Sequence, residues 1–343
     1  MKAAAFFECG GPEQIQFVDV PDPTWGPDEA LIRVQACALN RADLWMLNGP
    51  PDPGFRFPFW AGADIAGVVE AIGERVTSVS PGDRVLVNPG LYCGVCEHCV
   101  AGEHSLCLSY DTVGGRVPGG LADYFAISAG HLLSIPNEVP FRTAAAAPMT
   151  FMTAWRALVT RAALRPGEHV LILGASGGVG TACLQIARFS GARVTAITSS
   201  QSKVERLLQL GADAALNRNE GDPWQQVRDM TGGRGVDLVV ESVGGPTWQQ
   251  GLQSLAKGGR LVTFGRTAGG VGHTDIGLVF WNQLQIIGSS MSNNSEFKTV
   301  MQLVFQGRLQ PVIDRVFPLS QARAAFERLQ NAQHVGKILV EPS

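Results

Sequence analysis

The sequence lacks an excess of either charge and has no long run of basic residues. Its 343 residues include 27 lysines and arginines against 30 aspartates and glutamates, which gives a formal net charge of −3. Without a basic segment, nothing in the sequence would neutralise a nucleic-acid backbone or an anionic membrane surface. We therefore expect neither nucleic acid nor a membrane as a partner.

Long apolar runs are also missing. The first residues, MKAAAFFECGG, lack the apolar core of a signal peptide, and no stretch is long and apolar enough to cross a bilayer. No internal repeat or low-complexity tract is present. These absences predict a soluble, cytoplasmic protein, and the length of the chain suits two domains better than one core.

The most informative segment that is present spans residues 170–203. It predicts a strand at 170–173, a glycine turn, a helix, and a second strand at 192–198, which together form a βαβ unit. Glycines in the turn would allow a tight bend, close approach of a pyrophosphate, and packing of helix on strand. The spacing, GxxGxxG, is one residue longer than the common fingerprint, so a glycine turn without a dinucleotide is the alternative. The residues expected to bind the cofactor here are Ser176, Gly177, Gly178, Val179 and Gly180.

The rest of the chain predicts two domains and a returning tail. Residues 1–146 alternate between short strands and Pro/Gly corners, which is typical of an all-β, barrel-like domain. An alanine-rich helical segment begins near Thr143, and strands then alternate with helices through 147–289, including a helix around 248–256. Residues 290–343 are expected to return to the first domain. The predicted fold class is α/β, with a β-barrel domain joined to a doubly wound parallel sheet.

Four of the seven cysteines lie close together as C-x2-C-x2-C-x7-C, in a lobe of about residues 89–110. Four thiolates can surround one ion, and a tetrahedral set of four sulfurs selects zinc. The spacing differs from that of ferredoxin clusters, and four thiolates leave no place for His98 or His104. Such a closed site is structural, and free or disulfide-bonded cysteines are the alternative. The predicted zinc ligands are Cys93, Cys96, Cys99 and Cys107.

The order of these parts resembles the medium-chain dehydrogenase/reductase superfamily over nearly the whole chain. The stretches that carry the resemblance are GADIAGVVEAIG, SPGDRV, the four-cysteine segment, TAWRAL, GASGGVG, LGAD and GKILV. The resemblance implies a GroES-like catalytic domain, a Rossmann domain that binds a nicotinamide cofactor, and a cleft between them. It also implies a small-molecule substrate and assembly into a homodimer or homotetramer.

The resemblance also implies which positions of this chain correspond to the catalytic-zinc ligands of zinc alcohol dehydrogenases. The corresponding positions are Asn40, Ala63 and Met149, which offer no anionic or imidazole ligand. The glutamate of the family's Gly-His-Glu motif corresponds to Asp64, and the proton-relay hydroxyl falls at Ala42. In these departures the chain resembles the zinc-independent quinone oxidoreductase branch. The cysteine lobe is often absent from that branch, so the chain combines features of the zinc alcohol dehydrogenases and of the quinone oxidoreductases.

The candidate catalytic residues are therefore Asn40, Asp43 and Asp64, with Trp45 and Trp60 as apolar or stacking walls. An asparagine amide can donate to a substrate carbonyl and also hold a nicotinamide ribose, so Asn40 is the strongest candidate. Asp43 could instead cap the helix that follows Asn40, and Asp64 could hold a turn.

The end of the second strand of the βαβ unit predicts the cofactor. NAD-specific relatives carry an acidic residue there, whereas this chain has Thr198. Hydroxyl donors and basic side chains nearby favour NADPH over NADH. The alternative is that Lys203 is only a solvated helix residue and that Ser199 and Ser200 only form the N-cap of its helix. The residues expected at the 2′-phosphate are Ser199, Ser200, Lys203 and Arg218. Those implied by the resemblance at the nicotinamide half are Thr153, Val243, Phe264 and Gly265.

The sequence thus predicts NADPH-dependent hydride transfer to a quinone or an α,β-unsaturated carbonyl, without a catalytic metal and with one structural zinc. A zinc-type alcohol dehydrogenase is one alternative, and the missing ligands oppose it. A non-catalytic NADPH-binding regulatory module is the other, because a fold does not fix a function.

Overall fold

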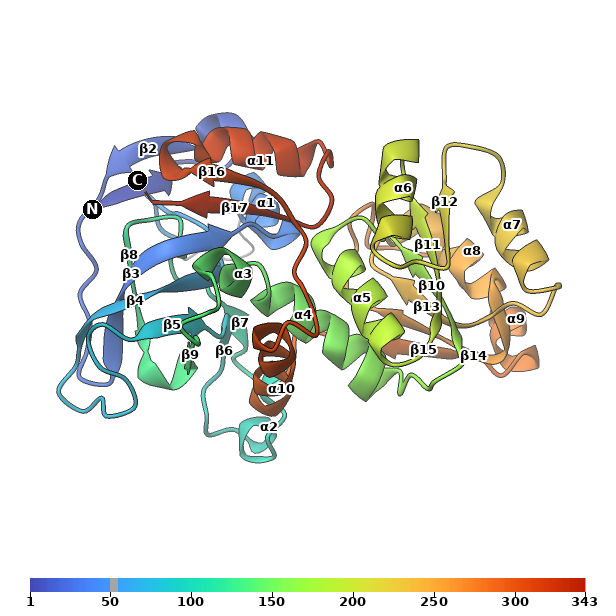
Figure 1. The fold of residues 1–343 in the computed structure, drawn as a ribbon, viewed down its shortest axis with the longest axis horizontal. Helices are drawn as coiled ribbons and strands as arrows, with labels where there is room; N and C mark the ends of the chain where they lie inside the picture. Colours follow the sequence, from blue (N-terminus) through green and yellow to red (C-terminus); the bar gives the residue numbers. More distant parts are fainter. Residues whose placement is uncertain (50–54, 343) are drawn as a thin grey trace. The chain divides into compact units, whose positions relative to one another are not determined.

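A computed structural model describes residues 1–49 and 55–342, which form two compact units (Figure 1). The first unit contains Met1–Met149 and Ser292–Ser343, and the second contains Thr150–Met291. The expected boundaries, after residues 146 and 289, lie three and two residues before the observed ones. Among the described residues, no helix has both the length and the apolar character needed to cross a membrane.

The first unit is built on a seven-stranded sheet with β3 at its centre. The strands follow the order β16-β17-β3-β4-β5-β9, and β8 also pairs with β3. All pairs are antiparallel except β16 with β17. The C-terminal tail therefore returns to this unit and contributes two of its strands. The bounds are β3 Glu29–Ala38, β4 Asp64–Ile72, β5 Arg84–Val87, β8 Tyr124–Ser128, β9 Leu132–Ser134, β16 Ile313–Pro318 and β17 Lys337–Glu341.

Smaller elements surround this sheet. Two short antiparallel pairs, β1 with β2 and β6 with β7, lie outside it. Helix α11 contacts β16 and β17 and buries Phe326 against the core of the unit. The bounds are β1 Lys2–Ala5, β2 Gln16–Asp19, β6 Gly90–Leu91, β7 Asp111–Thr112, α1 Arg41–Asn48, α2 Glu97–Val100, α3 Phe141–Ala145, α10 Asn294–Phe305 and α11 Ala322–Gln330.

The second unit is a six-stranded, entirely parallel sheet in the order β12-β11-β10-β13-β14-β15. Helices α5 and α6 cover one face, and α7, α8 and α9 cover the other (Figure 1). The order of strands reverses between β10 and β13, which is where doubly wound sheets bind ligands. The bounds are β10 His169–Leu173, β11 Arg193–Thr198, β12 Ala214–Asn217, β13 Val236–Glu241, β14 Leu255–Thr263, β15 Gln285–Gly288, α5 Gly178–Phe189, α6 Gln201–Gln209, α7 Pro223–Met230, α8 Trp248–Gln253 and α9 Ile276–Trp281.

Burial explains why these segments become strands. All five residues of β10 are buried, as expected for a central strand of a parallel sheet that helices cover on both faces. In α5 the apolar residues Ala182, Cys183, Ile186 and Ala187 are buried, whereas Val179 is partly exposed. The helix thus packs on β10 and β11 through its small and branched side chains.

The helices differ in three details from those that the sequence predicts. The alanine-rich segment is not one helix, because α3 ends before Pro148, α4 spans Pro148–Trp155, and Arg156–Arg161 forms a π-helix. The helix expected at 248–256 ends at Gln253, since Leu255 already pairs with β13. Helix α9 was not predicted because its apolar residues are largely exposed and show no buried stripe.

Candidate functional site

The three glycines of the βαβ turn differ in what the backbone requires of them. Gly174 has a φ of +66°, which favours glycine, and Gly177 is the N-cap of α5. A Cβ on Gly180 would lie 2.5 Å from the Gly174 carbonyl oxygen and 2.6 Å from that of Ala175, so only glycine allows this packing. A Cβ on Gly177 would meet that Gly174 oxygen alone, at 3.5 Å. The backbone at Gly177 is therefore open to a ligand.

Other expected cofactor residues lie at the same carboxyl edge of the sheet. Val243 follows β13, and its side chain is 3.3 Å from where a Cβ of Gly174 would be. Phe264 and Gly265 follow β14, and a Cβ on Gly265 would lie 2.9 Å from the Ser242 carbonyl oxygen. The fold thus gathers these residues with the segment 176–180 at the point where the strand order reverses.

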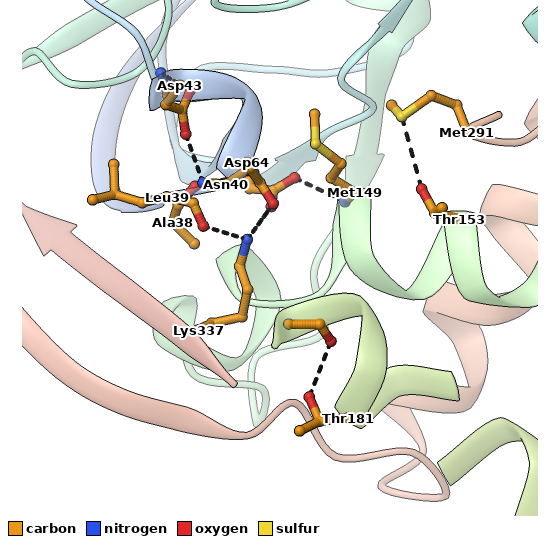
Figure 2. Close-up of polar contacts among 12 residues, drawn as sticks. Ala38, Leu39, Asn40, Asp43, Asp64, Met149, Thr153, Thr181, Met291 and Lys337 are labelled. Carbon is orange, nitrogen blue, oxygen red and sulfur yellow. Dashed lines mark hydrogen bonds and ion pairs between the residues drawn. The ribbon is translucent and has the colours of Figure 1, made fainter. Parts of the chain in front are cut away.

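Thr153 lies on α4 rather than on the sheet. Its hydroxyl is buried and donates to the Met291 sulfur at 3.8 Å, a contact within the second unit (Figure 2). The role of Thr153 at the nicotinamide half stays a prediction.

The carboxyl end of β11 offers hydroxyl and basic groups but no carboxylate. Thr198, its last residue, is 3% exposed, and its buried hydroxyl has no hydrogen-bond partner among the residues that the structure describes. Ser200 is the N-cap of α6 without a side-chain cap bond, and Lys203 in the first turn is only 9% exposed, which argues against a merely solvated lysine. Arg218 is exposed. An orphaned buried hydroxyl and an open glycine turn fit a dinucleotide at this edge.

The candidate catalytic residues come together in the first unit through strand register. Ala38, the last residue of β3, pairs with Asp64 of β4 on one side and with Leu339 of β17 on the other. Asn40 follows two residues after Ala38, and Lys337 precedes Leu339 by two residues on the same face of β17. The three polar side chains therefore meet around the end of β3 (Figure 2).

A buried ammonium joins this cluster. The Lys337 Nζ donates to Asp64 Oδ2 at 2.9 Å, to Asn40 Oδ1 at 2.6 Å, and to the Leu39 carbonyl oxygen at 2.7 Å. The Asn40 Nδ2 donates to Asp64 Oδ2 at 2.9 Å, and the Met149 N–H donates to Asp64 Oδ1 at 2.8 Å. The side chains of Lys337 and Asp64 are 4% and 0% exposed. Each buried charge is thus paired and hydrogen-bonded, as its burial requires.

Asp43 supports the backbone around this cluster. Its carboxylate accepts the Asn40 N–H at 2.6 Å and the Gly62 N–H at 3.0 Å. Gly62 has a φ of +103°, and a Cβ there would lie 2.5 Å from the Cys37 sulfur. Burial raises the pKa of Asp43 to about 6, against the opposing effect of these two N–H bonds. Asp43 therefore caps α1, as its structural alternative predicts, and it also holds the turn before β4.

The residues around Asn40 are poorly suited to bind a catalytic metal. Ala63 and Met149 offer no anionic or imidazole donor, and the Asp64 oxygens already accept three hydrogen bonds. Within the described ranges, the four lobe cysteines are the only group of three or more histidines, cysteines or acidic residues placed to share a metal ion. Of the expected walls, Trp60 packs against the core and Trp45 is 45% exposed.

Sequence reasoning gave no role to Lys337. Strand β17 begins with this lysine, which is buried. A lysine that opens an otherwise apolar strand is the available signal, because a buried ammonium needs an anionic partner. Asp64 and Asn40 are 273 and 297 residues away in sequence, so only the sheet register identifies them as partners.

The cysteine lobe has the geometry of a four-sulfur zinc site. The Sγ atoms of Cys93, Cys96, Cys99 and Cys107 all lie within 4.8 Å of one another. A tetrahedral ion with zinc–sulfur bonds of about 2.3 Å sets its sulfurs about 3.8 Å apart, close to the observed 3.5 and 4.0 Å for two pairs. The Cys93 N–H hydrogen-bonds the Cys107 sulfur and lowers its pKa to about 6, which favours the thiolate that binds metal.

His104 has a different partner from the lobe cysteines. Its two ring nitrogens lie 3.4 Å from the backbone nitrogen of Asn294 and 3.5 Å from its Nδ2. The same Nδ2 donates to the Tyr92 hydroxyl at 2.5 Å. His104 therefore helps to hold the lobe against the start of α10, which agrees with its exclusion as a zinc ligand.

Comparison with known families gives two matches along the chain. A model described as "Alcohol dehydrogenase GroES-like domain" matches residues 26–137, and one described as "Zinc-binding dehydrogenase" matches residues 178–306. These matches fall on the two kinds of domain that the fold contains.

Similar proteins span the full length of the chain. An NAD-dependent alcohol dehydrogenase of Saccharolobus solfataricus is 32% identical and is covered over 100% of both chains. An acryloyl-coenzyme A reductase of Sulfurisphaera tokodaii is 29% identical, over 97% of this chain and 98% of that protein. A quinone oxidoreductase of Rattus norvegicus is 31% identical, over 99% and 97%. A crystal structure of an NAD-dependent alcohol dehydrogenase superposes with a TM-score of 0.95 at 38% identity, over 99% of both chains.

The cysteine lobe should hold one zinc per chain. Cys93→Ser is expected to lose that zinc and to lower the melting temperature, because metal binding is linked to folding of the lobe. Elemental analysis and a thermal melt test this, with Cys9→Ser as the control, since Cys9 is an exposed cysteine outside the cluster. Two zinc ions per chain, or equal zinc in both variants, would contradict the assignment.

Lys337→Met should be strongly destabilising, because it leaves Asp64 buried without its cation. Breaking such a pair costs about 3–5 kcal/mol of unfolding free energy. Chemical denaturation should reveal the loss, and Lys2→Met is the matched control, since it breaks an exposed pair with Asp19 in the same unit. If both variants unfold at the same denaturant concentration, the buried network does not stabilise the unit.

Proposed function

Because this chain belongs to the medium-chain dehydrogenase/reductase superfamily and is an oxidoreductase, we propose that it transfers hydride from NADPH to a quinone or an α,β-unsaturated carbonyl. The proposal includes one structural zinc in the cysteine lobe and no catalytic metal. Relatives named acryloyl-coenzyme A reductase and quinone oxidoreductase support an activated, conjugated acceptor.

The observation that carries this proposal is the donor set around Asn40. Alcohol oxidation needs the hydroxyl proton to leave as hydride departs, and a Lewis-acid zinc assists that loss. Here the neighbouring positions are an asparagine, an alanine and a methionine, and Asp64 is bonded to an ammonium, an amide and a backbone N–H. These residues suit a reaction in which the acceptor is already electrophilic.

The bound nicotinamide would supply the hydride, and the chain's residues would stabilise the oxygen that becomes negative. Asn40 is the proposed donor to that oxygen. One of its two Nδ2 hydrogens is held by Asp64, whereas the other points to the Ala38 carbonyl oxygen at a long 3.4 Å. A substrate oxygen can replace that weak bond at little cost, and a donor fixed in advance is worth most in the transition state. Asp64 and Lys337 act as positioning residues that hold the amide.

NADPH is the proposed cofactor because β11 ends without a carboxylate. Thr198, Ser199 and Ser200 present hydroxyls, and Lys203 adds a positive charge in the first turn of α6. A phosphate on the ribose would be attracted by these groups, whereas an acidic residue at the strand end would repel it.

A homodimer or homotetramer is the proposed assembly. Strand β15 forms an edge of the parallel sheet, with Ile286 42% exposed. Nearby in the chain, Phe280 and Trp281 of α9 are 58% and 76% exposed. An open strand edge with large exposed apolar side chains supports pairing with a second copy.

An NAD-dependent alcohol dehydrogenase is the second candidate. The names of the Saccharolobus relative and of the superposed crystal structure favour it. In that case, residues other than Asn40, Ala63 and Met149 would have to assist the loss of the alcohol proton. The non-catalytic module has no observation in its favour beyond the fold.

The cofactor proposal predicts tighter binding of NADPH than of NADH. Lys203→Glu should reduce the ratio of the two affinities by about tenfold or more, since it replaces attraction of the 2′-phosphate by repulsion. Fluorescence titration of both cofactors measures the ratio, and Arg206→Glu, an exposed position on the same helix, is the control with the same charge change. Equal affinities in the wild type would refute the preference.

The reaction proposal predicts turnover of a simple quinone or enone with NADPH, and no efficient oxidation of plain alcohols. Asn40→Ala should lower kcat at least tenfold while NADPH binding is unchanged, because one preorganised donor is lost. Stopped-flow oxidation of NADPH measures both effects. Asn48→Ala, an exposed position at the end of α1, should match the wild type.

Added zinc should not create alcohol oxidation, and a chelator should not abolish quinone turnover within an assay. Efficient, zinc-dependent oxidation of simple alcohols would overturn the proposal. NADPH binding without turnover of any quinone, enone or aldehyde would favour the regulatory module instead.

A further inference from the structure

The second unit contains a hollow of about 350 Å³ that the proposed reaction does not use. Its lining comes from the amino ends of the parallel strands, since Glu168 precedes β10, Asp237 is the second residue of β13, and Gln285 begins β15. The glycine turn follows the carboxyl end of β10. In a parallel sheet these are opposite edges, so the hollow is separate from the expected dinucleotide site.

The lining carries positive charge that its own carboxylates do not neutralise. Glu168 accepts two bonds from Arg260, at 2.9 and 2.6 Å, and Asp237 pairs with Arg234 at 2.5 Å. Both acids are therefore already matched with arginines. Three exposed cations of the lining have no carboxylate partner within the described part of the chain: Arg161, Arg165 and Lys257. This concentration is opposite in sign to the net charge of the chain.

Hydrogen bonds hold two of the arginine side chains that line the hollow. Besides the two bonds to Glu168, the Arg260 guanidinium donates to the Ala162 carbonyl oxygen at 2.6 Å. Arg161 is partly held as well, because its Nε donates to the Gly288 carbonyl oxygen at 3.0 Å, which leaves its terminal nitrogens available. Preorganised cations lose less entropy when they bind an anion than free surface side chains do.

The backbone at the rim has two uncommon features. The π-helix Arg156–Arg161 ends at the hollow, and Ala163 has a φ of +48° although it is not glycine. Single π-turns and left-handed non-glycine residues are rare and occur often at functional sites. Both features lie in the segment from Arg156 to Arg165, which contributes Arg161 and Arg165 to the lining.

We propose that this hollow binds a small ligand with at least two phosphate groups, such as pyrophosphate or a nucleoside diphosphate. Guanidinium groups match phosphate oxygens in a planar, paired geometry, and Lys257 supplies a further point charge. The volume is of the size that small-molecule sites have. A ligand at this edge occupies a second site on the same unit and does not compete with the dinucleotide.

Calorimetric titration of the full-length protein with pyrophosphate tests the proposal. The protein is first saturated with whichever of NADP⁺ and NAD⁺ binds more tightly, so that the dinucleotide site cannot contribute. We expect saturable binding to the wild type, at least tenfold weaker binding to Arg165→Gln/Lys257→Gln, and a change of less than twofold for Arg193→Gln/Arg206→Gln. The control pair removes two exposed cations of the same unit that do not line the hollow.

Citrate serves as a carboxylate probe and should bind at least tenfold more weakly than pyrophosphate. The proposal is overturned if the wild type shows no saturable binding, or if the two double variants bind pyrophosphate equally. Citrate binding as tight as that of pyrophosphate would overturn the assignment of a phosphate ligand. All four positions are exposed, and a thermal melt of each variant establishes that a loss of binding is not a loss of fold.

Discussion

The buried contact between Lys337 and Asp64 is the constraint on which the candidate active site depends. An ammonium and a carboxylate that are 4% and 0% exposed can stay charged only if each keeps its partner and its hydrogen bonds. That requirement ties the C-terminal strand β17 to β4 across β3, and it holds the Asn40 side chain between them. The return of the tail to the first unit therefore completes the polar cluster as well as the sheet.

Local patterns of the sequence predicted the parts of the structure that local geometry determines. The glycine turn and the four cysteines are each formed by residues within a short segment, so their spacing alone indicates how they fold. The parallel sheet likewise follows from alternating apolar strands and helices. The partners of Lys337 could not be found in this way, because Asn40 and Asp64 become its neighbours only through the register of three strands. The π-helix is a similar case, since nothing in RALVTR distinguishes it from an α-helix.

The two units differ in how their polar residues are used. In the second unit, an open glycine backbone at Gly177 and an unpaired buried hydroxyl at Thr198 leave capacity for a ligand at the carboxyl edge of the sheet. In the first unit, nearly every polar atom around Asn40 is already bonded. Capacity there is limited to the weak bond between the Asn40 amide and the Ala38 carbonyl oxygen. The second unit thus offers a free backbone segment and a free hydroxyl, whereas the first unit offers one amide N–H in a fixed direction.

That direction follows from the hydrogen-bonding character of the neighbours. An ammonium can only donate, so Lys337 must face the oxygen of the Asn40 amide, and a carboxylate can only accept, so Asp64 must face the nitrogen. The orientation of the amide is thereby determined by its partners, although oxygen and nitrogen are similar in shape. The remaining amide hydrogen is a donor, and in the proposed reaction it would stabilise an oxygen that gains negative charge. The amide nitrogen cannot act as a base toward a hydroxyl proton, so the two neighbours that fix the amide also restrict what it can contribute to hydrogen-bond donation.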